Sequence, residues 1–229
     1  MQKLKVLILL SLFFTNIFFA DEPYVSESQL NEIGEKYDMV AKKRFIALQQ
    51  TLDSVKEKSD LEKLEAVNNF FNEVRYASDM KVYGKKDYWA TPCEFLCNDM
   101  GDCEDYVISK YCALKYLGVD RKKLFFTYAR STKYNELHMV LTYFETPKSE
   151  PLILDNYNRK IFPISERKDL TLVAYFTVIQ LETLPKLQIK DSTPIYSFNG
   201  DIFDKVGKEN EKSHKKWDEL RLNIQRKKI

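Results

Sequence analysis

Apolar residues recur at three- and four-residue steps through the first half of the chain, a period that predicts amphipathic helices. One such run extends from Ser26 to about Val55, and another follows from Asp60 to Val74, where Ser59 or Asp60 can cap the N-terminus. A third run covers Cys103 to Leu117 and stops at Gly118, a residue type common just after a helix. The intervening segment 76–90 has no clear period and predicts a loop, and Thr91-Pro92 then starts a short turn or helix.

The pattern changes to strands after the third helix. Alternating or β-branched apolar runs predict strands at Leu124–Ala129, Leu137–Phe144, Leu152–Asp155 and Pro194–Phe198. The apolar stretch Thr171–Leu184 fits either a strand or a helix. Helices followed by strands predict an α+β fold, in which the N-terminal helices and the Cys103 helix pack on an antiparallel sheet.

The first twenty residues predict export from the cytoplasm. Lys3 and Lys5 precede an almost wholly apolar stretch from Val6 to Phe19, as in a signal peptide. Phe18 fits the small-residue cleavage rule poorly if the cut follows Ala20, so an uncleaved N-terminal anchor is the alternative. Residues 21–229 are predicted to form a single domain outside the cytoplasm, with 204–229 as a charged, solvated helical tail.

The hydrophobic fraction and the net charge of the chain limit which kinds of molecule it is expected to bind. The chain has 229 residues, 44% of them hydrophobic, which is enough for a sizeable core. Its net charge is only +2, and no basic patch with interleaved aromatic residues is present in the body of the sequence. This balance argues against nucleic acid as a partner.

Four cysteines fall within one short segment: Cys93, Cys97, Cys103 and Cys112. In an exported protein such cysteines first suggest a disulfide, and Cys93 and Cys97 are the pair closest in sequence. Four residues apart on a regular helix is poor disulfide geometry, so that pairing stays open. A zinc site is disfavoured because no histidine lies nearby, and Cys112 is expected to pack as a small hydrophobe.

Cys103 is the candidate nucleophile because it lies at a helix N-terminus, where backbone N–H groups and the helix dipole lower a thiol pKa. His138 on a following strand can accept its proton, and Asp155 at the end of the next strand can orient the imidazole. The other histidine, His214, lies among lysines in the tail. Each residue is ordinary alone, but their order predicts nucleophilic catalysis.

Three carboxylates crowd the same thiol: Asp102, Glu104 and Asp105. Acids at a helix start can serve as caps and offset the helix dipole. Clustered carboxylates are equally good ligands for a hard cation. Spacing alone leaves both interpretations open.

Several stretches together resemble the bacterial transglutaminase-like cysteine proteinases of the LapG type. They are Asp87–Pro92, Glu94–Leu96, Gly101–Tyr106, His138–Leu141, Leu152–Asn156 and the later fragment Tyr196–Gly200. The main resemblance extends from about Asn69 to Ile164. It implies a papain-like, transglutaminase-type fold with Cys103, His138 and Asp155 as the catalytic triad.

The resemblance also implies a calcium requirement, with Asp102 and Glu104 as ligands and Asp105 as a further one. Trp89 matches a tryptophan near the active site, beside a surface that meets substrate or partner. Proteins of this type are periplasmic and cut a large surface adhesin near its N-terminus, which releases cells from a biofilm. An inner-membrane receptor for a cyclic dinucleotide sequesters them.

The residues are also compatible with two other functions. A transferase on the same fold would pass the acyl group to an amine, and a non-catalytic periplasmic binding protein would keep the triad without using it. Between Asp169 and Tyr196 the chain is longer than the family pattern, and Leu172–Lys190 resembles an insertion. This segment is a candidate for an extra strand pair, an altered surface or a partner-binding element.

Overall fold

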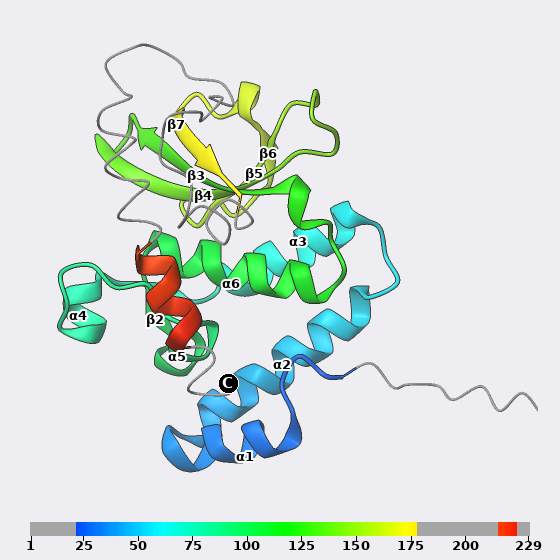
Figure 1. The fold of residues 1–229 in the computed structure, drawn as a ribbon, viewed down its shortest axis with the longest axis vertical. Coiled ribbons are helices and arrows are strands. Elements are labelled where there is room, and N and C mark those ends of the chain that lie inside the picture. The colour runs from blue at the N-terminus through cyan, green and yellow to red at the C-terminus, as the bar shows by residue number, and fades with distance from the viewer. Residues whose placement is uncertain (1–21, 178–214, 224–229) are drawn as a thin grey trace, which may run out of the picture.

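The computed structural model describes residues 22–177 and 215–223. Helices fill one half of the molecule and an antiparallel sheet the other, as Figure 1 shows. The helices are α1 (Glu27–Lys36), α2 (Met39–Val55), α3 (Asp60–Phe71), α4 (Asp79–Tyr83), α5 (Pro92–Asn98), α6 (Cys103–Tyr116) and a further helix at 215–223, with 3-10 turns at Arg121–Lys123 and Ile164–Glu166. The α+β prediction is confirmed.

Local capping explains where several helices begin. The Ser59 side chain accepts a hydrogen bond from the backbone N–H of Glu62, and the Glu62 carboxylate accepts one from the backbone N–H of Ser59, a capping box. Thr91 and Glu94 form the same arrangement at α5. The single run predicted from Ser26 to Val55 is wrong, because Asp38 starts a new helix by accepting the Ala41 N–H at 2.6 Å.

The main sheet has the strand order β6-β5-β4-β3-β7, and every neighbouring pair is antiparallel. Its strands are β3 (Leu124–Ser131), β4 (Glu136–Tyr143), β5 (Leu152–Leu154), β6 (Phe162–Pro163) and β7 (Leu170–Phe176). The ambiguous stretch after Leu170 is therefore a strand at its start, paired with β3. The rest of Leu172–Lys190 and the strand predicted at Pro194–Phe198 lie outside the described residues.

Two short strands join the helical half. β1 (Arg75–Tyr76) and β2 (Met100–Gly101) pair in parallel, with Tyr76 opposite Gly101. This pairing and α4 lie in or beside a segment predicted to be a loop. The pairing matters because β2 leads directly into α6.

The two faces of the sheet have different partners. Met139, Leu141 and Tyr143 of β4 belong to the large apolar core that also contains residues of α3 and α6. Val140 on the opposite face packs in a small cluster with Ala129, Ile153 and Leu170. Strand β4 is thus covered on both faces and is a rigid place from which to present a side chain.

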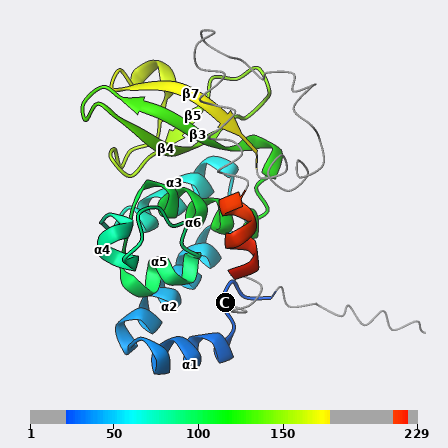
Figure 2. The same cartoon turned by 60° about the vertical axis from the view of Figure 1, so that its left-hand side comes forward.

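A helix at 215–223 completes the core. Trp217 and Leu220 are 4% and 1% exposed, and the Trp217 ring lies 5.9 Å from that of Phe126 and 6.4 Å from that of Tyr111. Figure 2 shows this red helix alongside α6. The tail is helical here as predicted, but the prediction that it is solvated is wrong for this stretch because its apolar face covers α6 and β3.

Within the described ranges no helix is long and apolar enough to cross a membrane. The stretch 1–20 that predicts a signal peptide or anchor lies outside those ranges.

Candidate active site

The N-terminus of α6 is positioned by close packing around Gly101. Asp99 ends α5 with φ of 52°, and β2 then pairs with β1 before the helix starts at Cys103. A Cβ atom on Gly101 would overlap the Asp105 carboxylate and lie 2.6 Å from the Phe95 ring. Only glycine lets the backbone at this position lie so close to Asp105 and Phe95 without moving them. This close packing fixes the position of Cys103 at the start of α6.

Asp105 is buried and ties the start of α6 to the preceding segment. Its Oδ1 accepts the Ala90 N–H at 2.9 Å, and its Oδ2 accepts the Asp102 N–H at 3.3 Å. Burial raises the pKa of Asp105, and nearby Glu104 adds to this effect. Asp105 therefore holds the backbone on both sides of the site in place, and it is also one of the acidic groups beside the thiol.

The Cys103 thiol donates a hydrogen bond to Glu104 Oε2 at 2.8 Å. Burial raises the pKa of the thiol, and the Glu104 and Asp102 carboxylates raise it further. A hydrogen bond from the Met139 backbone opposes them. This contact places the thiol beside β4, next to the residue that follows His138, while burial and the neighbouring carboxylates favour the protonated thiol.

His138 and Asp155 form a buried pair. Both are 1% exposed, and His138 Nε2 lies 2.7 Å from Asp155 Oδ1. His138 Nδ1 is buried and has no hydrogen-bond partner among the described residues. With Nε2 engaged by the carboxylate, Nδ1 is the nitrogen left to exchange a proton.

Two further groups fix the Asp155 carboxylate. Arg167 Nη2 donates to Oδ2 at 2.6 Å, and the Tyr157 N–H donates to Oδ1 at 2.9 Å. Burial alone would raise the pKa of Asp155, but the hydrogen bond and charge of His138, with Tyr157 and Arg167, lower it to about 2. Arg167 was not predicted, because nothing in its sequence surroundings marks it as a partner of a distant strand end.

Aromatic rings surround the imidazole. Tyr157 stacks on His138 with ring centroids 3.9 Å apart and an interplanar angle of 5°. Tyr76 and Tyr134 pack edge-on against Tyr157 and are 54% and 50% exposed. Burial raises the pKa of Tyr76, and so does Cys103, which places this tyrosine near the thiol. These rings form an exposed surface next to the candidate catalytic groups.

Three buried or half-buried carboxylates converge beside the thiol. Oxygen atoms of Asp79, Asp102 and Asp105 all lie within 4.8 Å of one another. Burial and neighbouring acids raise the pKa of Asp79 to about 6 and that of Asp102 to about 10. One oxygen of Asp79 and one of Asp102 are buried with no hydrogen-bond partner among the described residues. Repelling carboxylates with unused oxygens fit a hard divalent cation.

This cluster differs from the expected ligand set. Asp102 and Asp105 belong to it, whereas the third member is Asp79, and Glu104 instead accepts the thiol hydrogen bond. Asp79 was missed because it lies in the segment predicted to be a loop, 23 residues before Asp102. It is held there by the Tyr88 N–H, which donates to Oδ2 at 2.5 Å.

Trp89 does not lie on the surface. Its side chain is 3% exposed, its ring is 6.3 Å from that of Phe126, and Lys216 Nζ lies 5.4 Å above it. The indole is buried, in part because the helix at 215–223 helps to cover it. A role toward substrate or receptor stays a prediction.

None of the four cysteines forms a disulfide. The Sγ atoms of Cys93 and Cys97 lie 3.6 Å apart on α5, in contact but not bonded. Cys112 packs partly buried against the core, in agreement with its expected role as a small hydrophobe.

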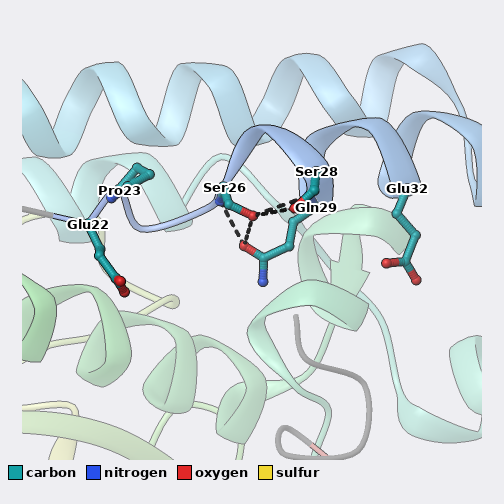
Figure 3. Close-up of a pocket in the computed structure, with 6 residues that line it drawn as sticks. All are labelled: Glu22, Pro23, Ser26, Ser28, Gln29 and Glu32. Carbon is teal, nitrogen blue, oxygen red and sulfur yellow. Dashed lines mark hydrogen bonds between the residues drawn. The ribbon is translucent and has the colours of Figure 1, made fainter.

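An open hollow beside the start of α1 is distant from these groups. Figure 3 shows Ser26 hydrogen-bonded to Gln29 and Ser28 within it. These bonds belong to the capping of α1, and α1 lies at the end of the molecule opposite the sheet (Figure 1). The hollow is lined by Glu22, Pro23, Ser26, Ser28, Gln29 and Glu32.

Known proteins resemble the chain in sequence and structure. A family model described as bacterial transglutaminase-like cysteine proteinase matches residues 41–172. Calcium-bound Legionella pneumophila LapG is 35% identical, with a TM-score of 0.60 over 81% of this chain and 99% of that one. The EGTA-treated form is 41% identical, with a TM-score of 0.59 over 68% of this chain and 83% of that one.

A further structure of Legionella pneumophila LapG gives 41% identity and a TM-score of 0.59 over 66% of this chain and 82% of that one. No curated protein sequence matches. The family model spans more than half of the chain, and each of the structural matches covers about two thirds of it or more. The chain therefore belongs to the bacterial transglutaminase-like cysteine proteinases, of the LapG type.

Proposed function

We propose that this protein is a cysteine endopeptidase in which Cys103 is the nucleophile, His138 the general base and acid, and Asp155 the orienting acid. The observation that carries the proposal is the buried His138–Asp155 pair at 2.7 Å, with His138 Nδ1 left without a partner among the described residues. The Cys103 thiol contacts the backbone of Met139, the next residue on the same strand.

The reaction follows from these positions. His138 Nδ1 takes the thiol proton, and the Cys103 sulfur attacks the substrate carbonyl carbon. The proton then passes to the departing amine as the peptide C–N bond breaks, which leaves a thioester on Cys103. Water, losing a proton to the same imidazole, hydrolyses the thioester. Backbone N–H groups at the start of α6 are suited to stabilise the oxyanion.

Asp155 acts through the imidazole. Its carboxylate fixes Nε2 as the nitrogen that carries the hydrogen, which leaves Nδ1 as the acceptor for the thiol proton. The lowered pKa of Asp155 means that this carboxylate stays ionised throughout the physiological range. Arg167 supports it by a buried ion pair.

Calcium is the proposed cofactor, held by Asp79, Asp102 and Asp105, with Glu104 close by. When bound, the ion would supply positive charge beside Cys103 and so favour the thiolate. The unpartnered carboxylate oxygens support this assignment. The similar structures of Legionella pneumophila LapG in calcium-bound and EGTA-treated forms add to that support.

The proposed substrate is the N-terminal region of a large surface adhesin, cleaved in the periplasm to release the adhesin and disperse a biofilm. An inner-membrane receptor for a cyclic dinucleotide is the proposed regulator. Both proposals rest on membership of the LapG type. The exposed rings of Tyr76 and Tyr134 beside the site offer a surface on which an extended peptide can lie.

The test is cleavage of purified adhesin N-terminal fragments by the exported domain, with calcium or with EGTA. The wild-type protein should give two products in calcium and none in EGTA. Cys103→Ala should be folded and inactive, while Cys112→Ala, which alters a thiol elsewhere on α6, should cleave normally. Cleavage by Cys103→Ala at the wild-type rate would contradict the assignment, and an amine added to the product would favour a transferase.

A further inference from the structure

Lys110 is a buried charge that the proposed mechanism does not use. It lies in the middle of α6 and is 1% exposed. Burial lowers its pKa to about 7, although nearby Asp155 acts in the opposite direction. Burying a lysine ammonium group costs free energy unless hydrogen bonds satisfy its donors.

Those bonds go to two asparagines of the α3 region. Lys110 Nζ donates to Asn68 Oδ1 and to Asn72 Oδ1, each at 2.8 Å. Both asparagines are themselves buried. Because a lysine ammonium group only donates, it requires both amide oxygens to face it and turns both NH2 groups away.

The two NH2 groups then point at one turn of the chain. Asn72 Nδ2 donates to the Asp155 carbonyl oxygen, and Asn68 Nδ2 donates to the Arg159 carbonyl oxygen, each at 2.8 Å. These carbonyls mark the two ends of the turn 155–159. The same turn carries the Asp155 carboxylate that bonds to His138 and the Tyr157 ring that stacks on it.

We propose that Lys110, Asn68 and Asn72 are positioning residues that hold the turn 155–159 against α3 and α6, and so set the place of Asp155 and Tyr157 relative to His138. The inference deepens the proposed protease function and rests on it for its catalytic meaning. The three residues touch no reacting atom and act only through the turn.

The linkage joins the two halves of the site. Cys103 and Lys110 are on the same helix, two turns apart, whereas His138 lies on β4 and Asp155 directly follows β5. Lys110 thus connects the helix of the nucleophile to the loop that orients its base. A displacement of about 1 Å in such a constellation can reduce the rate roughly 100-fold.

The sharpest test is Asn72→Asp. The carboxylate keeps an acceptor for Lys110 but loses the donor to the Asp155 carbonyl, so the fold should be retained while the turn is released. We expect kcat to fall at least about tenfold with KM within about twofold. Asn68→Asp is the matched control, since it makes the same change at the Arg159 end, and its effect on kcat should be smaller.

Lys110→Met provides a second variant that keeps the volume and removes the donor. Its loss of kcat should be non-additive with that of Asn72→Asp, because both act through one hydrogen-bond chain. If Asn72→Asp leaves kcat within twofold of wild type, the proposal is overturned. Equal losses in Asn72→Asp and Asn68→Asp would overturn the specific role of the Asp155 end.

A spectroscopic readout separates this inference from the protease assignment. The chain has two histidines, so the imidazole nitrogen signals of His138 can be assigned with a His214→Asn variant. Asn72→Asp should shift the Nε2–H proton signal of His138, and Asn68→Asp should shift it less. If the wild-type protein cleaves no peptide yet this signal responds as expected, the function fails and the positioning role stands; an unchanged signal overturns the positioning role.

Discussion

The ring of Tyr157 lies flat against the imidazole of His138, with centroids 3.9 Å apart and planes within 5°. Tyr157 also donates its backbone N–H to Asp155 and its hydroxyl to Glu136 Oε1, at 2.9 and 2.7 Å. One residue therefore restrains both the imidazole ring and the carboxylate that orients it.

Removing the stack should impair catalysis more than removing the hydroxyl. Tyr157→Ala frees the imidazole to tilt, so we expect kcat to fall about tenfold, the cost of imprecise positioning. Tyr157→Phe keeps the ring and should retain kcat within about twofold. Steady-state kinetics on a peptide that spans the cleavage site measures both, and equal rates for the two variants would show that the stack is unimportant.

Arg167 should determine part of the acid stability. Asp155 has a pKa of about 2 in the folded protein against 3.8 when unperturbed, so its contribution is present above about pH 4 and is lost as pH falls through 2. Arg167→Gln should raise the folded pKa of Asp155 and also that of Asp169, which shares the guanidinium. The free energy of unfolding should then fall less steeply between pH 4 and 2.

Urea unfolding at several pH values in this range gives the slope. Arg159→Gln is the control, because Arg159 pairs with Glu73 on the surface, where both side chains are more than 60% exposed. That variant should keep the wild-type slope. A wild-type slope in Arg167→Gln would mean that Arg167 does not stabilise the Asp155 carboxylate.

Asp79 should be needed for calcium. Asp79→Asn removes one of three converging carboxylates, so calcium affinity should fall by more than tenfold and the rise in Tm on adding calcium should shrink. Asp99→Asn is the control, since Asp99 pairs with Arg44 and Arg75 outside the cluster. Isothermal titration of the EGTA-stripped protein measures the affinity, and unchanged binding by Asp79→Asn would exclude this ligand set.

The helix at 215–223 should contribute strongly to stability. Trp217→Ala empties a site beside Tyr111 and Phe126, and we expect a loss of about 3–5 kcal/mol. Leu222→Ala on the same helix removes a side chain that is 47% exposed and should cost under about 1 kcal/mol. Chemical denaturation compares them, and equal losses would mean that Trp217 does not anchor this helix.

Much of the secondary structure could be predicted from residues that are close together in the sequence. Ser59, Thr91 and Gly118 mark helix ends by their own side chains or lack of one, and alternation revealed β3 and β4. The order of Cys103, His138 and Asp155 indicated that the last two would meet, and they are in contact. The family and the fold class are confirmed as well.

The rest depends on contacts between distant segments. Asp79 reaches Asp102 only because β1 pairs with β2, and a two-residue parallel pairing leaves no periodic signal. Arg167 meets Asp155 through a turn whose path is set by the sheet. Trp217 is surrounded by charged residues in sequence, so its burial against Phe126 was hidden by local polarity.

The packing of Trp217 and Leu220 has a consequence for how the protein is made. Both side chains fill the core between α6 and β3, yet they follow every strand that the structure describes in the order of synthesis. The nascent chain therefore carries an open apolar surface until residues 215–223 emerge. This part of the core can close only after residues 215–223 are made, and a chain that stops before them would leave that surface open to aggregation.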